Sequence, residues 1–291
     1  MAMDEFRAVL KAREFVNKVK PAIIPVPVEI YAQHVGAIIR PQTDLGPDEP
    51  GWSFESKGKR YICTNANDGP ERQRFTVCHE LAHLVLGLPS EHGGSSWWSY
   101  AKRPLAEIIC DVFAAELLLP YGLFKPEAEK SPISLPAVDD LAARFRASTT
   151  ATGSRYAAMV NTPIAFVLSE QGQVRYASRS KALREANAWI QPRLKLPRNS
   201  ISEKVRAGVL CDGPEEIDAD IWFKDWERGG MLLEEARHLA HWDQTITLLW
   251  FEDEEVPSPK PREGREEEDG DDGLLKELDG NLPWPGKRRR R

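Results

Sequence analysis

The chain has 291 residues, of which 41% are hydrophobic, and a net charge of −6 at pH 7. This length accommodates two domains with hydrophobic cores, and the weak negative charge excludes a broad nucleic-acid-binding surface. No apolar run approaches the roughly 20 residues that span a bilayer, and the amino-terminal stretch MAMDEFRAVLKAREF carries charges where a signal peptide is apolar. We therefore expect a cytoplasmic protein without membrane association.

The first informative element in chain order is a helix that contains an H-E-x-x-H motif, formed by His79, Glu80 and His83. Residues 68–71 read Asp-Gly-Pro-Glu, a typical helix start, and Gly87 is a typical helix stop. Histidines four residues apart lie one turn from each other, so both imidazoles reach one metal ion while Glu80 faces the same cleft. The motif predicts a zinc site; the alternative is two core histidines satisfied by hydrogen bonds.

Residues 90–103 form the loop that follows this helix, and they include an aromatic cluster of Trp97, Trp98 and Tyr100. Exposed aromatic side chains in a flexible loop suit the binding of a protein substrate. The same cluster is also typical of a partly buried loop anchor, and the sequence leaves both interpretations open.

A second helix, bounded by prolines at 104 and 120, supplies acidic residues for the metal site. At about 100° per residue, Asp111 lies on the face of Glu107, whereas Glu116 lies on the opposite face. We predict that Glu107 is the third ligand and that Asp111 accepts the free N–H of a ligand histidine. A solvated helix edge is the alternative for Asp111 and the expectation for Glu116.

This set of residues predicts the chemistry of a hydrolase. Zinc held by three protein groups lowers the pKa of its water toward about 7, and Glu80 can take the proton when that water attacks a peptide carbonyl. We therefore expect Glu80 to be the catalytic base. Zinc is the expected ion, and the sequence leaves manganese as an alternative.

These residues resemble the ImmA/IrrE metallopeptidases of bacteria and their mobile elements. The resemblance implies a zincin-like fold in which His79, His83 and Glu107 bind zinc. It also implies cleavage of a helix-turn-helix repressor of the xenobiotic-response-element (XRE) type, in a stress-response or mobile-element circuit. Ala82, where the family usually has glycine, and Cys78 are departures that remove no ligand. The resemblance covers a short amino-terminal helix, VPVEIYAQHVGAIIR at 26–40, a GWSFESKGKRYICTN hairpin at 51–65, RQRFTVCHELAHLVLGLP at 72–89, EIICDVFAAELLLP at 107–120 and LAARFRAS at 141–148.

The hairpin is a candidate site for the substrate, because the edge strand of a sheet can pair with an extended peptide. Either residues 52–56 or residues 60–65 could be that edge, and the sequence does not decide between them.

Two short helices are expected between 134 and 160, with a break near 147–148, in an arrangement that resembles a helix-turn-helix. A DNA-reading second helix needs several basic residues, yet Arg155 is the single one between 148 and 160. Direct DNA binding is therefore disfavoured, and packing on the zinc domain or holding the substrate is the preferred role.

The remaining chain is predicted to be a small α+β domain at 161–252, followed by a disordered tail. Apolar runs flank a turn at 170–173, and residues 220–226 and 245–252 are typical of strands. The paired histidines, His238 and His241, lack a nearby ligand arrangement and are expected to be packing or surface residues. The four cysteines show no C-x-x-C pairing and are interpreted as reduced thiols.

The segment from 252 to 279 is strongly acidic, and the chain ends in five basic residues at 287–291. Such a composition predicts disorder, and we expect the basic end to fold back on the acidic linker.

The predicted fold class is therefore α+β. It comprises a zinc metallopeptidase domain at 1–130, a helix-turn-helix-like segment at 131–160, the small α+β domain at 161–252 and the tail at 253–291. Two functional hypotheses follow: a zinc endopeptidase that cuts a regulatory DNA-binding protein, or a non-proteolytic, antitoxin-like binding protein that retains the zincin fold. The intact Glu80 favours the peptidase, because a binding protein is free to lose the base.

Overall fold

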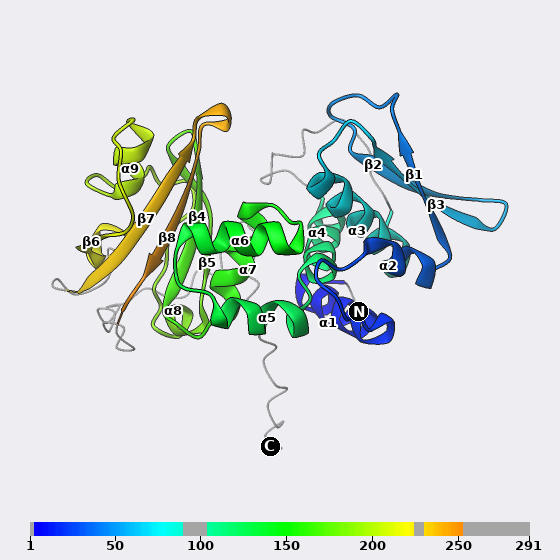
Figure 1. Cartoon of the computed structure of the whole chain (residues 1–291), viewed down its shortest axis with the longest axis horizontal. Helices are drawn as coiled ribbons and strands as arrows, with labels where there is room; N and C mark the ends of the chain where they lie inside the picture. The colour runs from blue at the N-terminus through cyan, green and yellow to red at the C-terminus, as the bar shows by residue number, and fades with distance from the viewer. Residues whose placement is uncertain (1–2, 90–103, 224–229, 253–291) are drawn as a thin grey trace, which may run out of the picture. The chain divides into compact units, whose positions relative to one another are not determined.

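The computed structural model of the chain describes residues 3–89, 104–223 and 230–252. These residues form two compact units (Figure 1). The first unit contains the described residues up to Ser131 together with 136–152, and the second contains 132–135 and the described residues from Gly153 onward. The boundary falls within helix α7 (Thr149–Met159).

The first unit begins with two helices that pack on its core, α1 (Glu5–Val19) and α2 (Val28–His34). Asp4 caps α1 by accepting a hydrogen bond from the backbone N–H of Arg7 at 2.8 Å, which satisfies one of the free donors at the helix start. The buried face of α1 includes Phe15, whose ring packs 5.9 Å from that of Phe113 in helix α4 (Leu105–Leu118). Helix α1 therefore contributes directly to the core against which α4 packs.

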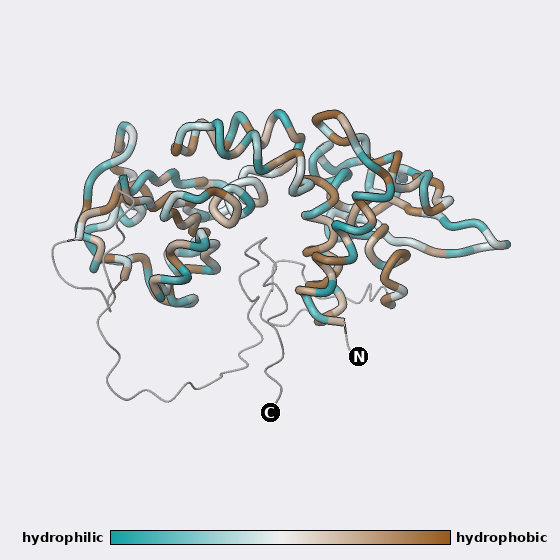
Figure 2. The backbone as a smooth tube through the Cα atoms, turned by 90° about the horizontal axis from the view of Figure 1, so that it is seen from below, coloured by the Kyte–Doolittle hydropathy of each residue, from teal (hydrophilic) through white to brown (hydrophobic). Residues whose placement is uncertain are grey.

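A three-stranded sheet follows, built from β1 (Ala37–Gln42), β2 (Gly51–Ser56) and β3 (Lys59–Asn65) in the order β1-β3-β2. Strands β2 and β3 are antiparallel, so the hairpin expected at 51–65 is confirmed. Positive φ angles at Lys57 and Gly58 form its turn, and Figure 2 shows mostly hydrophilic colour at this end of the hairpin. Because β3 is the central strand, β2 has a free edge within the described sheet.

The motif helix is α3 (Pro70–Leu86), and it packs against α4 and against strands β2 and β3 (Figure 1). Pro70 occupies the first helical position and Gly87 ends the helix at φ = 65°, as the sequence predicted. Gly69 is the N-cap residue and makes no side-chain hydrogen bond, whereas the Asp68 side chain pairs with Arg72 at 3.0 Å.

Three further helices follow α4 along the chain, namely α5 (Tyr121–Lys130), α6 (Leu135–Phe145) and α7. The two short helices expected between 134 and 160 are therefore present, with the break at 146–148. Arg146 adopts φ = 51° at this break. The Phe145 ring packs 5.1 Å from that of Phe124, which anchors the end of α6 on α5.

The second unit is built on a five-stranded antiparallel sheet with the strand order β5-β4-β8-β7-β6. The hairpin formed by β4 and β5 turns at Gln171 and Gly172, both at positive φ, where the sequence predicted a turn. Short helices α8 (Lys181–Glu185) and α9 (Ile201–Arg206) follow the hairpin. The strands are β4 (Ile164–Glu170), β5 (Gln173–Arg179), β6 (Glu215–Asp218), β7 (Met231–Leu239) and β8 (Gln244–Trp250).

The prediction of a strand at 220–226 is wrong for residues 220–223, which the structure describes. Residues 219–221 form a 3₁₀ turn, and Trp222 and Phe223 are buried in the core of the unit. Their aromatic side chains therefore fill the core without a strand ladder, and Trp222 donates its indole N–H to Glu234 at 3.1 Å. Residues 224–226 lie outside the described part.

Glu234 is a fully buried carboxylate in β7 whose oxygens accept several hydrogen bonds. The donors include the backbone N–H groups of Ile201 and Ser202, at 3.0 and 2.8 Å, at the start of α9. A buried carboxylate is costly unless its lone pairs are satisfied, so this network fixes α9 on the sheet.

The four cysteines are free, and three of them, Cys63, Cys78 and Cys110, are buried. Burial raises the pKa of the Cys78 thiol to about 12, which keeps it protonated and unreactive. The described helices include none long and apolar enough to cross a membrane. The acidic and basic tail at 253–291 lies outside the described residues.

Candidate functional site

The two motif histidines lie in the last turns of α3, on the side that faces α4. Four residues of helix bring His79 and His83 one above the other, with their Nε2 atoms 3.1 Å apart. The His83 side chain is only 2% exposed and that of His79 is 11% exposed, so the pair is shielded without being sealed from solvent.

Glu107 reaches this pair from the first turn of α4. Its Oε2 lies 3.1 Å from His79 Nε2, and its Oε1 lies 3.4 Å from His83 Nε2. Ligand atoms of the three residues all lie within 4.8 Å of one another. No other such group of three histidine, cysteine or acidic residues occurs in the described part of the chain, and His238 and His241 belong to none.

The spacing of these atoms fits a tetrahedral metal ion. Two ligand atoms that each lie about 2.0–2.2 Å from zinc, at the tetrahedral angle, are about 3.3–3.6 Å apart. The observed separations of 3.1 and 3.4 Å are close to this range. Two imidazoles and one carboxylate are also the donor set of many zinc hydrolase sites, which keep the fourth position open.

The other nitrogen of each imidazole also has a partner. Asp111 Oδ1 lies 2.9 Å from His79 Nδ1, as its position one turn after Glu107 predicts. The backbone carbonyl of Leu88 lies 3.3 Å from His83 Nδ1. Both partners are acceptors, so they favour a proton on Nδ1 and direct the lone pair of Nε2 toward the cluster.

The Leu88 carbonyl was not anticipated from sequence, because a backbone group has no residue signature. It is placed by the left-handed turn at Gly87, after which the Leu88 N–H donates to the carbonyl of His83 at 3.2 Å. The sequence identified Gly87 as the end of the helix. Its effect on the orientation of His83 depends on the path of the backbone after the helix, which the sequence does not give.

The electrostatics of the cluster favour a positive charge. Burial lowers the pKa of His79, but hydrogen bonds with Asp111 and Glu107 outweigh it and raise the pKa to about 10. Burial raises the pKa of Glu107, and the hydrogen bonds with His79 and His83 hold it well below its usual range. A proton on His79 therefore supplies the charge that a divalent cation would supply when bound.

Glu80 is buried beside the cluster, with 2% of its surface exposed. Its Oε2 accepts a hydrogen bond from the Ser53 hydroxyl at 2.7 Å. Ser53 lies in β2, and sequence reasoning missed it because no periodicity connects the strand with the helix.

Close packing between β2 and α3 sets the distance that this hydrogen bond needs. A side chain at Gly51 would place its Cβ 2.2 Å from the Cys63 carbonyl oxygen and 2.7 Å from the Thr76 side chain. Only glycine allows the strand to approach the helix this closely.

Glu116 corrects a sequence-based expectation. It was expected on a solvated helix edge, but it is 1% exposed, pairs with Arg13 at 3.4 Å and accepts the backbone N–H of Tyr121 at 2.9 Å. The opposite face of α4 packs on α1, which supplies the arginine. The candidate substrate-binding aromatics, Trp97, Trp98 and Tyr100, lie outside the described residues.

The site and the fold define a candidate metal centre of the H-E-x-x-H type, and part of the chain is similar to a family of peptidases. Residues 43–156 match the Peptidase M78 family, described as the IrrE N-terminal-like domain. Over this segment, which is less than half of the chain, the sequence is similar to the ImmA/IrrE family.

Two curated relatives carry the name radiation response metalloprotease IrrE. The chain is 30% identical over 130 residues to the protein of Deinococcus radiodurans, which covers 43% of this chain and 39% of the relative. It is 35% identical over 104 residues to the protein of Deinococcus deserti, which covers 33% and 34%. The matched segments thus span well under half of the length of these relatives.

A solved structure described as a Mycobacterium tuberculosis transcriptional regulator has a similar fold. The TM-score is 0.54, with 12% sequence identity over 84% of this chain and 74% of that chain.

Proposed function

We propose that this chain is a zinc-dependent endopeptidase that cleaves a regulatory protein. The observation that carries the proposal is the convergence of His79, His83 and Glu107, whose ligand atoms lie within 4.8 Å of one another. The match of residues 43–156 to a metallopeptidase family supports the same conclusion. Manganese remains the alternative ion, since imidazole and carboxylate groups bind it as well.

In this proposal the three residues hold the ion through His79 Nε2, His83 Nε2 and a carboxylate oxygen of Glu107. A bound zinc ion would act as a Lewis acid that makes water nucleophilic near neutral pH. Asp111 and the Leu88 carbonyl orient the two imidazoles, so that the ligand atoms keep their direction when a substrate arrives.

Glu80 is the proposed general base. One of its oxygens, Oε2, is engaged by Ser53 at 2.7 Å, which leaves Oε1 to accept a proton from the attacking water and to deliver it to the leaving amine. Fixing one oxygen holds the other in a single orientation, and this lowers the reorganisation needed during proton transfer.

Strand β2 is the proposed edge for the substrate. Of the two segments that the sequence left open, the one at 60–65 belongs to the central strand β3, whereas 52–56 belongs to β2. An extended peptide that pairs with β2 would lie beside the strand that carries Ser53, and therefore close to Glu80.

We further propose that the substrate is an XRE-type helix-turn-helix repressor in a stress-response or mobile-element circuit. The two relatives named as radiation response metalloproteases support a stress-related role. The second hypothesis, a non-proteolytic binding protein, has no use for a buried Glu80 held in place by Ser53, so the peptidase is the better account of the site.

The test uses the purified full chain, loaded with zinc, and the helix-turn-helix repressor encoded nearest to its gene. We expect the repressor to be cut at one site, and cleavage to stop when zinc is chelated and to return when zinc is restored. Fragment masses would identify the scissile bond.

Glu80→Gln is the matched control, because it changes the base while leaving the ligands in place. We expect this variant to bind zinc with the same stoichiometry and to cleave at least about a hundredfold more slowly. Cleavage by Glu80→Gln at the wild-type rate would reject the proposed mechanism. Tight repressor binding by the zinc-loaded wild type without cleavage would favour the non-proteolytic hypothesis.

A further inference from the structure

The three-stranded sheet of the first unit has an outer face to which the proposed chemistry assigns no role. Successive side chains of a strand point to opposite faces of a sheet. Since Ser53 points to Glu80 on α3, its neighbours Trp52 and Phe54 point to the face away from that helix. Phe54 is 39% exposed. The edge strand β2 therefore presents a large apolar side chain on the outer face, one residue from its contact with the proposed base.

Phe54 is the last member of a row of side chains that crosses the three strands. The register pairs Ile38 of β1 with Tyr61 of β3, and Tyr61 with Phe54 of β2. The rings of Phe54 and Tyr61 are stacked, with centroids 5.0 Å apart and an angle of 21° between their planes. The guanidinium group of Arg40 lies 4.4 Å from the centroid of the Tyr61 ring. Contacts from the β3 side therefore hold the Phe54 ring in a defined orientation.

The second face of the Phe54 ring is directed toward the free edge of β2. Tyr61 covers the first face from the β3 side, and within the described sheet β2 has no neighbouring strand on its other side. A peptide that pairs with β2 would place the side chain opposite Phe54 on the same outer face, with Cβ atoms about 4.5–5.5 Å apart. This side chain would extend the row by one member, in contact with the ring.

The chemistry of the row determines which kind of side chain fits there. Ile38, at the other end of the row, is 43% exposed, so the row is an apolar strip that reaches the surface at both ends. Aromatic and branched apolar side chains form favourable pairs across neighbouring strands. Among the described strand residues on this face, the charged ones are Arg40 and Lys59, and both are cationic. Their charge opposes a lysine or arginine in the same place.

We infer that Phe54 is a specificity-determining residue, which selects an apolar side chain of an extended substrate close to the scissile bond. This role rests on the proposed peptidase function and on pairing of the substrate with β2. Because Glu80 reaches the scissile carbonyl through one water molecule and Ser53 contacts Glu80, the scissile bond lies within about two residues of the substrate position opposite Ser53. The selected side chain belongs to the neighbouring position, opposite Phe54. The substrate is therefore a peptide with an apolar residue at one fixed position beside the cleavage site.

The test uses the zinc-loaded full chain and a degenerate peptide library, whose cleavage products are identified by mass spectrometry. The amino acids found at each position relative to the cut give the preference of the enzyme there. At one position we expect the wild type to prefer phenylalanine over lysine about three- to tenfold. Phe54→Glu should reverse this preference, because its carboxylate pairs with lysine, and it should leave the preferences at the two adjacent positions unchanged.

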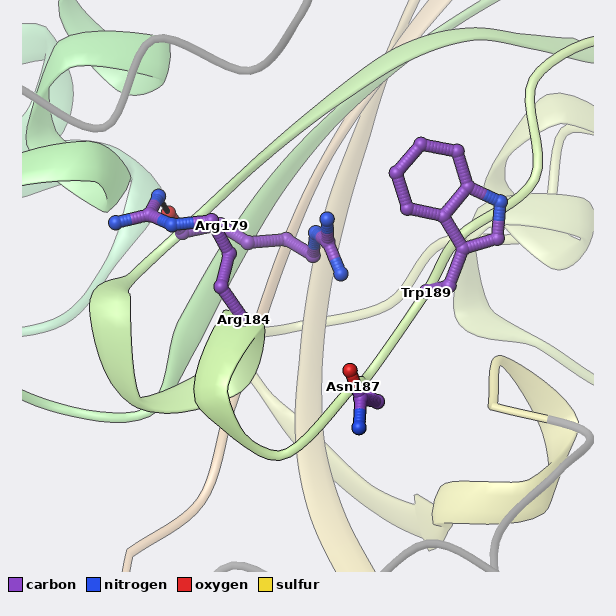
Figure 3. Close-up of a pocket in the computed structure, with 4 residues that line it drawn as sticks. All are labelled: Arg179, Arg184, Asn187 and Trp189. Atoms are coloured by element: carbon purple, nitrogen blue, oxygen red, sulfur yellow. Dashed lines mark hydrogen bonds between the residues drawn. The ribbon is translucent and has the colours of Figure 1, made fainter. Parts of the chain in front are cut away.

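Two further variants separate the chemistry of the side chain from a general effect on the fold. Phe54→Leu keeps an apolar side chain and should retain the wild-type preference. The matched control is Trp189→Ala, which removes a half-exposed ring from the second unit, where the Arg179 guanidinium lies 4.7 Å from the ring centroid (Figure 3). Its preferences should equal those of the wild type. Zinc stoichiometry and the circular dichroism spectrum verify that each variant folds.

The outcomes distinguish the role of Phe54 from the proposed function. Unchanged preferences in Phe54→Glu would overturn the role of Phe54 and leave the peptidase proposal standing, as would an equal change at adjacent positions. If the zinc-loaded wild type cleaved neither the library nor the repressor, the proposed function would fail, and the role of Phe54 with it.

Discussion

At the scale of single residues, the hydrogen bond from Ser53 orients the buried carboxylate of Glu80, the residue that we propose as the general base. A hydrogen bond to a charged group contributes about 1.5–3 kcal/mol, enough to select one orientation of the carboxylate. Because Ser53 belongs to the edge strand β2, the orientation of the Glu80 carboxylate depends on where that strand lies.

We predict that Ser53→Ala lowers kcat about 10- to 100-fold while KM and zinc content change little, since about 1.4 kcal/mol corresponds to a factor of ten in rate. Ser53→Thr keeps the hydroxyl and should recover most of the activity. The measurement is steady-state cleavage of the repressor or of a peptide containing its scissile bond. Ser56→Ala, an exposed position of the same strand, serves as the control. A loss in Ser53→Thr as large as that in Ser53→Ala would contradict a role for the hydroxyl.

Asp111 permits a second prediction at this scale, because it acts on the ion only through His79. Removing such a partner of a ligand histidine typically weakens metal binding about 10- to 100-fold. We therefore expect Asp111→Ala to bind zinc that much more weakly in competition with a chromogenic chelator, with an unchanged circular dichroism spectrum. An unaltered zinc affinity would show that His79 does not need this partner.

At the scale of helices and strands, the sequence predicted the parts of the site that follow from helical spacing. His79, His83, Glu107 and Asp111 lie together because each helix turns by about 100° per residue and the two helices pack face to face. The position of Ser53 could not be derived in this way, because it depends on how a strand packs on a helix 27 residues away in sequence.

Two sequence predictions were wrong, those for Glu116 and for the strand at 220–226, and each error has a local cause. Glu116 was expected in solvent since the spacing within α4 shows which face it occupies but not that α1 covers this face with Arg13. The strand expected at 220–226 came from aromatic composition, which describes buried positions in general. Trp222 and Phe223 are buried outside any strand.

The close approach of β2 to α3 leads to a prediction about glycine. Gly51→Ala would place a methyl group 2.7 Å from the Thr76 side chain of α3 and 2.2 Å from the Cys63 carbonyl oxygen of β3, so β2 must move relative to both. We expect a lower melting temperature and a loss of cleavage activity at least as large as that of Ser53→Ala, with zinc still bound. Gly46→Ala is the matched control, because its Cβ would meet nothing closer than 3.7 Å. Equal melting temperatures for the two variants would contradict this account.

At the scale of the whole molecule, the chain contains two units that each bury carboxylates for different purposes. In the first unit Glu80 and the metal-site residues carry the proposed chemistry, whereas in the second unit Glu234 is fully occupied with hydrogen bonds to the start of α9 and to Trp222. The buried carboxylate of Glu234 therefore stabilises the packing of α9 and of Trp222 within the second unit.

We predict that Glu234→Ala destabilises the second unit by at least about 2 kcal/mol, because it leaves several buried donors without an acceptor. Zinc stoichiometry and affinity should remain those of the wild type, since every metal-site residue belongs to the first unit. Denaturant unfolding followed by tryptophan fluorescence, with zinc binding measured in parallel, checks both statements. A parallel loss of zinc would mean that the two units do not unfold separately.

The glycine turn after α3 has a consequence for how such sites can vary. Because the helix ends in a left-handed turn at Gly87, the carbonyl oxygen of Leu88 lies beside the second histidine, so the length of the helix is itself part of the geometry of the candidate metal site. One more helical turn would carry that oxygen away and leave the imidazole free to rotate. A glycine four positions beyond the last motif histidine is therefore a constraint worth testing in any chain suspected of carrying this centre.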